Sequence, residues 1–288
     1  MRLGSEWRYH ATKETTNLMN ENAIITVYVI IDDTLKALGH ESDKRALVSD
    51  AEVLTVAILA AKYFQNHHER TLCLLKSSGY LSRSLSISRF NRRVHQLSDW
   101  LRLILDSLCV LATTGNAFII DSMPLPVCRR VRASRCKKVK GLAYCGYCAA
   151  KKERFYGYRL HLICNAEGIP VTFRIWPAFF HDINPAEELL TDLPPFSRVA
   201  ADKGYISAPL AARVLANSGV TLIAQRRKNM TPLPETDAEF IRSHRHRIET
   251  LNSQLEAMGT QRLHARTVDG FFIKVHAALL ALVCTFVD

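Results

Sequence analysis

Three acidic residues, Asp121, Asp202 and Glu249, lie where the hydrophobic pattern of the chain ends or turns polar. Asp121 closes the apolar run 117–120, Asp202 closes the run 199–201, and Glu249 lies in a polar stretch of helical spacing. Carboxylates at the ends of neighbouring buried strands converge in space. Because converging carboxylates repel one another in a cleft of low dielectric, hard divalent cations are their natural complement. The spacing therefore predicts a magnesium site built from these acids.

The composition is that of a folded, basic protein. The chain has 288 residues, of which 48% are apolar, so it can form one large domain or two smaller ones with a buried core. Its 38 Lys and Arg against 27 Asp and Glu give a formal net charge of +11 and an isoelectric point of about 9.4. This charge favours a polyanionic partner such as nucleic acid, with a merely basic protein as the alternative.

Positive charge is concentrated between Cys128 and Arg159, where eleven Lys or Arg residues accompany a single acid, Glu153, and interleaved aromatic residues. Such a segment can neutralise phosphates and stack on exposed bases, with a solvated loop as the alternative. The candidate DNA-binding residues are cations of this segment and of three later sites: Arg129, Arg130, Arg132, Arg135, Lys137, Lys138, Lys203, Arg226, Arg227, Arg242 and Arg245.

Four of the eight cysteines cluster in the same segment. Cys145 and Cys148 have the two-residue gap of a zinc knuckle, and Cys128 and Cys136 lie upstream. A structural zinc held by these four thiolates is one hypothesis. The wide gap between Cys128 and Cys136 argues against it, and reduced thiols are the alternative.

The first part of the chain alternates apolar stripes of helical period with short polar breaks. This pattern predicts helices over residues 23–38, 50–64, 67–77, 86–97 and 100–113. Residues 1–115 should therefore form an all-helical domain. A turn followed by a basic helix around Arg89 is typical of a major-groove reader, with ordinary helical packing as an equal alternative, and we assign DNA binding to this domain.

Neither a secretion signal nor a membrane span is expected. Residues 1–10 are polar and charged, and the longest apolar run, 271–287, is interrupted by Lys274 and His276. A cytoplasmic protein follows from this interpretation.

After Asn116 the pattern changes to short strands alternating with helices. Strands are predicted over 117–121, 158–165, 169–176, 198–202 and 220–224, and helices over 184–192, 207–217 and 238–258. A hairpin followed by alternating strands and helices predicts an α/β (α+β) mixed sheet covered by helices, the element order of the ribonuclease H fold. This domain would span 116–288, with a basic, Cys-containing insertion at about 128–157. Its first and fourth strands are adjacent, which would bring Asp121 beside Asp202.

Five ordered segments of the second half carry a family resemblance: 119–128, 155–162, 181–182, 201–205 and 247–250. Through them the chain resembles the DDE transposases of bacterial insertion sequences, and in detail it is most similar to the insertion sequence 982 family. Where related transposases carry a lysine after the glutamate of the last helix, this chain has Glu256, and Arg242 replaces an aromatic residue. The phosphate contact that this lysine makes in related transposases would fall to Arg242 or Arg262 here.

The resemblance implies a ribonuclease H-like domain in which Asp121, Asp202 and Glu249 hold two Mg²⁺ ions, with Mn²⁺ able to substitute. It implies an enzyme that binds double-stranded DNA at the terminal inverted repeats of its own element, cleaves it and joins the ends to target DNA. A homodimer or larger assembly on DNA and a location at the bacterial nucleoid follow from the same resemblance. The alternatives are a nuclease of this fold without strand transfer and a catalytically inactive DNA-binding repressor.

Three residues carry weaker hypotheses. Asp182 would either support the metal pocket or cap the helix that begins near residue 184. Lys203 would hold a phosphate or be a surface lysine, and His161 would contact DNA or be a hydrogen-bonded structural histidine.

Overall fold

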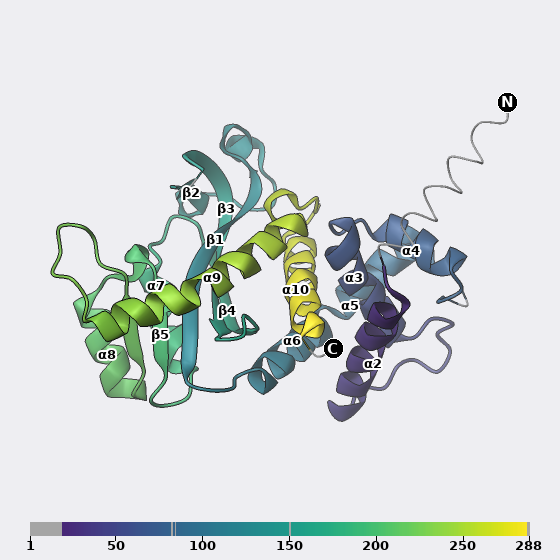
Figure 1. The fold of residues 1–288 in the computed structure, drawn as a ribbon. Helices are drawn as coiled ribbons and strands as arrows, with labels where there is room; N and C mark the ends of the chain where they lie inside the picture. The colour runs from purple at the N-terminus through teal and green to yellow at the C-terminus, as the bar shows by residue number, and fades with distance from the viewer. Residues whose placement is uncertain (1–18, 82, 84, 150, 287–288) are drawn as a thin grey trace. The chain divides into compact units, whose positions relative to one another are not determined.

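The protein is described by a computed structural model that covers residues 19–81, 83, 85–149 and 151–286 (Figure 1). The chain divides into two compact units. One contains the described residues up to Leu105 together with those from Asp269, and the other spans Asp106–Val268. The predicted second domain, 116–288, differs from this division, because the last helix is grouped with the first unit.

The first unit is all-helical within its described residues, as expected. It contains α2 (Glu21–Ala37), α3 (Asp50–Phe64), α4 (His68–Ser77), α5 (Ile87–Gln96), most of α6 (Ser98–Leu111) and α10 (Val268–Thr285). A capping box starts α3, because Ser49 and Glu52 each accept a hydrogen bond from the other's backbone N–H. Most side chains of α3 and α10 are buried, so these two helices form the core of the unit.

By length and composition, α10 is the one helix of the described residues that could cross a membrane, with a mean hydropathy of 1.7 over 18 residues. However, 67% of that window is buried inside the protein. Its burial is that of a core helix, which explains an apolar sequence without a membrane.

The second unit is built on a mixed sheet of six strands within its described residues. They are β1 (Ala117–Arg129), β2 (Cys145–Cys148), β3 (Glu153–Asn165), β4 (Pro170–Pro177), β5 (Arg198–Ala201) and β6 (Thr221–Ala224). The order across the sheet is β2-β3-β1-β5-β6, with β4 also paired to β3. β3 pairs antiparallel with β1, β2 and β4, whereas β5 runs parallel to β1 and β6. This topology confirms the predicted ribonuclease H-like mixed sheet.

Helices cover both faces of this sheet. α7 (Ile183–Thr191) and α8 (Ala208–Ser218) pack on the face that carries Phe118 and Ile120. Because side chains alternate along a strand, Ile119 and Asp121 point to the opposite face, which α9 (Glu235–Ala257) crosses (Figure 1). Short 3₁₀ segments complete the unit: η1 (Arg130–Arg135), η2 (Leu142–Tyr144), η3 (Lys203–Tyr205) and η4 (Thr260–Arg262).

The first strand of the sheet is longer than predicted. β1 continues past Asp121 to Arg129 although it contains Pro124 and Pro126. Its pairing with β5 ends at Ile120, so the later part of β1 has β3 on one side and, among the described strands, no partner on the other. The carbonyl of Pro124 accepts a hydrogen bond from Gln261 Nε2 at 2.7 Å and so faces the unpaired side. A proline at this position interrupts no hydrogen bonds between β1 and β3, because the side on which its N–H is missing faces away from β3.

Candidate active site

The adjacency of β1 and β5 brings two of the three predicted acids together. The last residue pair of these parallel strands is Ile120 with Ala201, and Asp121 and Asp202 come next on each strand. Both side chains lie on the face crossed by α9 and line one depression with Arg245. The convergence predicted from the strand ends therefore exists, although Asp121 itself lies within β1.

Asp121 is held by hydrogen bonds from two sides. The backbone N–H of Ser122 donates to Oδ1 at 2.8 Å, and Asn252 Nδ2 donates to Oδ2 at 2.9 Å. Burial raises the pKa of Asp121 to about 7, and the charges of Asp202 and Asp182 act in the same direction, against the Ser122 N–H. Burial also raises the pKa of Asp202, although the N–H of Gly204 donates to its Oδ1 at 2.7 Å. In both acids burial is the main cause, because it disfavours the charged carboxylate.

The long helix α9 is anchored over the sheet near its start. Arg198 at the beginning of β5 pairs with Asp237 at 2.8 Å, and its guanidinium lies 4.3 Å from the ring centroid of Phe240. Ile241 and Ile248 of α9 pack at the same depression as Asp121 and Asp202. The helix therefore covers the acid pair with its buried face, which also carries Arg245.

Glu249, the third predicted acid, does not join that pair. Its side chain is 56% exposed, and Oε1 accepts a hydrogen bond from Arg245 Nε at 2.7 Å. Arg245 also donates to Gln225 Oε1 at 2.7 Å. Glu249 instead lines a wider, open groove together with Arg226 and Arg242.

The carboxylate that does approach the pair is Asp182, from the segment between β4 and α7. Its Oδ1 accepts a hydrogen bond from Ser122 Oγ at 2.9 Å and lies 3.6 Å from Arg159 Nε. Asp182 is the N-cap residue of α7, yet its side chain makes no capping hydrogen bond. The structure therefore places Asp182 near the acid pair and gives it no capping role, while support of a metal pocket stays a prediction.

His161 lies behind Asp182 and is 1% exposed. Its Nδ1 is 3.4 Å from the hydroxyl of Tyr205, and burial lowers its pKa to about 4. Of the two roles expected for His161, the structural one holds.

The donor set suits a hard divalent cation. Asp121, Asp182 and Asp202 supply only carboxylate oxygens, and Gly204 leaves open the space between two of them that a Cβ would fill. Within the described residues, no three His, Cys, Asp or Glu side chains are arranged around a single point. The reason is visible in the contacts, since each carboxylate is turned toward a protein donor.

The four cysteines predicted to bind zinc are likewise not arranged around a single point in the described part of the chain. The thiols of Cys128 and Cys136 contact each other, whereas Cys145 lies across β3, opposite Tyr156. All four of these cysteines, Cys128, Cys136, Cys145 and Cys148, carry free thiols. A zinc ion held by these four thiolates therefore stays a prediction.

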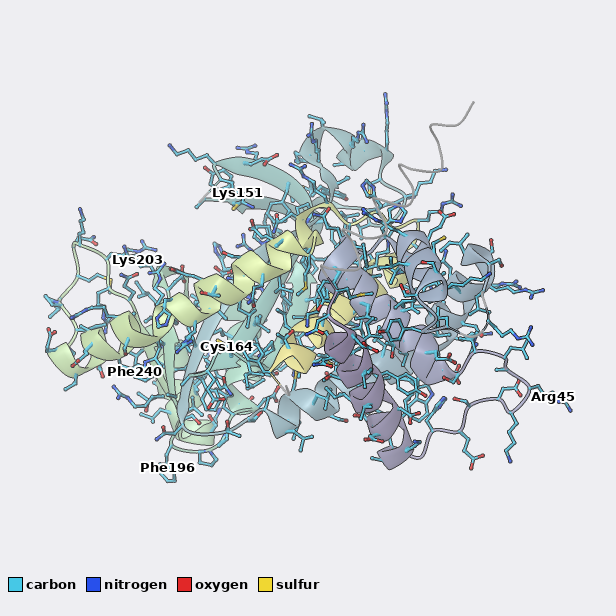
Figure 2. All side chains as sticks on the ribbon, turned by 45° about the vertical axis from the view of Figure 1, so that its right-hand side comes forward. Arg45, Lys151, Cys164, Phe196, Lys203 and Phe240 are labelled. Carbon is cyan, nitrogen blue, oxygen red and sulfur yellow. The ribbon has the colours of Figure 1, made fainter. Side chains whose placement is uncertain are left out.

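The predicted DNA-binding cations fall into two groups. Arg129, Arg130, Arg132, Arg135, Lys137, Lys203, Arg226, Arg227 and Arg242 are exposed, and Figure 2 labels Lys203. Lys138 and Arg245 are partly buried, and Lys138 donates to the carbonyl of Ala265 at 2.9 Å. Of the aromatic residues in the basic segment, Phe155, Tyr156 and Tyr158 are buried, so the base-stacking role expected of them is wrong, whereas Tyr147 is exposed.

A family model described as "Transposase DDE domain" matches residues 111–268, more than half of the chain. The chain belongs to the DDE transposase domain family. The match contains Asp121, Asp202 and Glu249 and nearly coincides with the second compact unit. A search of curated proteins found no match.

Two solved transposase structures were also matched at low similarity. One is a Mos1 transposase paired-end complex with left transposon end, with 8% identity and a TM-score of 0.24, covering 76% of this chain and 81% of that one. The other is a pre-cleavage Mos1 transpososome, with 7% identity and a TM-score of 0.21, covering 78% of this chain and 82% of that one. Values this low carry little weight, and the ribonuclease H-like assignment of this DDE domain follows from its own strand order.

One polar residue of the DDE domain had no signal of its own in the sequence. Asn252 contacts Asp121 from α9, three residues after Glu249. Helical spacing places residues 249 and 252 on one face, so a systematic search for polar residues around Glu249 would have found it.

Proposed function

We propose that this transposase, of the insertion sequence 982 type, binds the terminal inverted repeats of its own element and catalyses cleavage and strand transfer. The proposal rests above all on one observation: Asp121 and Asp202 lie side by side beneath α9, next to Arg245. Membership of the DDE transposase domain family supports it.

The acids of this site would hold divalent cations. Asp121, Asp202 and Glu249 would bind two Mg²⁺ ions, or Mn²⁺ in their place, which supply Lewis-acid stabilisation of the attacking and leaving oxygens of a phosphodiester. Arg245 reaches the same depression, so its guanidinium can hold a phosphate oxygen of the DNA. Lys203, exposed next to Asp202, can bind a neighbouring phosphate.

We infer that Glu249 turns toward the acid pair when a cation binds there. Arg245, Glu249 and Asn252 share one helical face, and the residues on both sides of Glu249 already contact the acid pair or line its depression. The ion pair that holds Glu249 is largely exposed, and such pairs stabilise by only about 0–1 kcal/mol. A cation at Asp121 and Asp202 would therefore compete effectively for this carboxylate.

The surfaces that would contact DNA come from both units. In the second unit, η1 exposes Arg130, Arg132 and Arg135 beyond the end of β1. In the helical unit, α5 buries Phe90 and Val94 and exposes Arg89 and Arg92. An exposed basic helix face suits the major groove, and the basic 3₁₀ segment suits the backbone. We propose that both act on duplex DNA at the nucleoid, in a homodimer or larger assembly that handles two ends together.

The test is incubation of the purified chain with Mg²⁺ and a labelled duplex that carries the DNA flanking its own coding region. Nicking at the element boundary and joined products are expected. Asp202→Ala should abolish both, whereas Asp192→Ala, at an exposed aspartate paired with Arg174, should retain them. Degradation without joined products would point to a nuclease, and binding without cleavage to a repressor.

A further inference from the structure

Asp182 is fixed in place by groups that do not belong to its own helix. Ser122 Oγ donates to Oδ1 at 2.9 Å, and Arg159 Nη1 donates to the same Ser122 Oγ at 3.3 Å. Arg159 is held in turn by the carbonyl of Tyr147, which accepts from Nη2 at 3.0 Å. The side chain of Asp182 is therefore oriented from β1 and β3, the strands that carry the site.

The second oxygen of Asp182 faces Asp202. A Cβ placed on Gly204 would lie 2.9 Å from Asp182 Oδ2 and also 2.9 Å from Asp202 Oδ1. Carbon atoms do not approach carboxylate oxygens that closely without displacing them, so only glycine leaves both carboxylates where they are. Gly204 is exposed, which keeps this space open to solvent and to ions.

The charges around this space do not balance. The charges of Asp182 and Asp202 act on Asp121, although the three carboxylates are not arranged around a single point, and Arg159 and Arg245 are the cations that act on Asp202. Arg245 is already paired with Glu249, and Arg159 Nε is buried without a hydrogen-bond partner. Clustered carboxylates of this kind are stabilised by a bound divalent cation.

We propose that Asp182 is a fourth carboxylate of the cation site, and that residue 204 is glycine because a side chain would part Asp182 from Asp202. This inference rests on the proposed function, since it adds a ligand to the site of Asp121, Asp202 and Glu249. Asp182 Oδ2 contacts the cation bound by Asp202, while Ser122 and Arg159 hold Oδ1.

The experiment measures Mn²⁺ binding to the full chain without DNA, by electron paramagnetic resonance of the free ion and by calorimetry. Asp182→Asn should weaken Mn²⁺ binding by about tenfold or more. Gly204→Ala should weaken it similarly without removing a carboxylate. The matched control is Asp192→Asn, at an exposed aspartate that ends α7, which should bind Mn²⁺ like the wild type. Thermal melting in chelator shows whether each variant is folded.

The outcomes separate the two proposals. If Asp202→Asn loses Mn²⁺ binding while folded Asp182→Asn and Gly204→Ala bind it like the wild type, Asp182 is not a ligand and the proposed function stands. If the wild type binds no Mn²⁺, or if Asp202→Asn binds it unchanged, the cation site itself fails and this inference fails with it. Should Asp182→Asn not fold, Gly204→Ala decides the matter, because it leaves every charge in place.

Discussion

The side-chain amide of Asn252 on α9 donates a hydrogen bond to Asp121 Oδ2 on β1 at 2.9 Å, across 131 residues of sequence. This bond links the helix that carries Glu249 to the strand that carries the first acid of the site. It also supplies a hydrogen-bond donor to one oxygen of Asp121, whose charged form is disfavoured by burial. Asn252 therefore both positions α9 and stabilises the ionised form of Asp121.

Replacing Asn252 with Ala should lower both stability and cleavage. A hydrogen bond to a charged group contributes about 1.5–3 kcal/mol, and its loss leaves a buried carboxylate oxygen without a donor. Chemical unfolding measures the change at a pH where Asp121 is ionised. Asn217→Ala, on the exposed side of α8, is the control and should change stability by less than about 0.5 kcal/mol. An equal effect of the two substitutions would show that the contact with Asp121 contributes nothing.

Glu249→Gln should abolish cleavage with little effect on folding. Glu249 is exposed and its partner is a surface arginine, so the unfolding free energy should change by less than about 1 kcal/mol. Cleavage should fall by orders of magnitude because the third acid is lost. Glu256→Gln is the matched control, since Glu256 is an exposed acid of the same helix that pairs with Lys151 at 2.9 Å. Normal cleavage by Glu249→Gln would remove Glu249 from the site.

The stability of the protein in chelator should fall as the pH rises through the range in which Asp121 ionises. Burial raises its pKa from 3.8 to about 7 in the folded protein. When folding raises the pKa of an acid, the acid does not reduce the stability of the folded state at pH values below its pKa in the unfolded chain. The loss of stability accumulates as the pH rises from the unfolded pKa to the folded pKa, and for this shift it reaches about 4 kcal/mol.

Asp121→Asn removes that cost. In chelator, its melting temperature relative to the wild type should therefore rise between about pH 4 and about pH 7 and then level off. Added Mn²⁺ should stabilise the wild type progressively more over the same range, because the cation binds the ionised carboxylate. If the difference in melting temperature between the wild type and Asp121→Asn stayed constant with pH, the raised pKa of Asp121 would be contradicted.

The salt dependence of DNA binding tests the basic 3₁₀ segment. The triple substitution of Arg130, Arg132 and Arg135 by Ala should weaken binding to all duplex sequences alike. The slope of log K against log salt should become shallower by about 0.9 for each DNA phosphate that the variant no longer neutralises. Arg213→Ala, at an exposed arginine of α8 paired with Glu187, is the control. An unchanged slope in the triple variant would remove η1 from the DNA interface.

The elements that could be predicted from sequence are those whose pattern is local. The helix of residues 50–64 follows from apolar periodicity and from the capping box of Ser49 and Glu52, both of which act within a few residues. The hairpin between β3 and β4 follows from residues 165–168, where Gly168 has a φ of 91°. The length of β1 was missed because prolines normally end a strand, and only the absence of a neighbouring strand beyond Ile120 makes them tolerable.

The sequence by itself determined which acids and cations the protein has, the order of its strands and helices apart from β2 and α10, and through them its family. Only the tertiary structure decided that Asp182 faces Asp202, that Asn252 rather than Glu249 contacts Asp121, and that α10 belongs to the helical unit. The physical reason is distance along the chain. Periodicity and caps act between near neighbours, whereas these contacts depend on strand register and on the rotation of a helix about its axis, which packing against the rest of the fold sets.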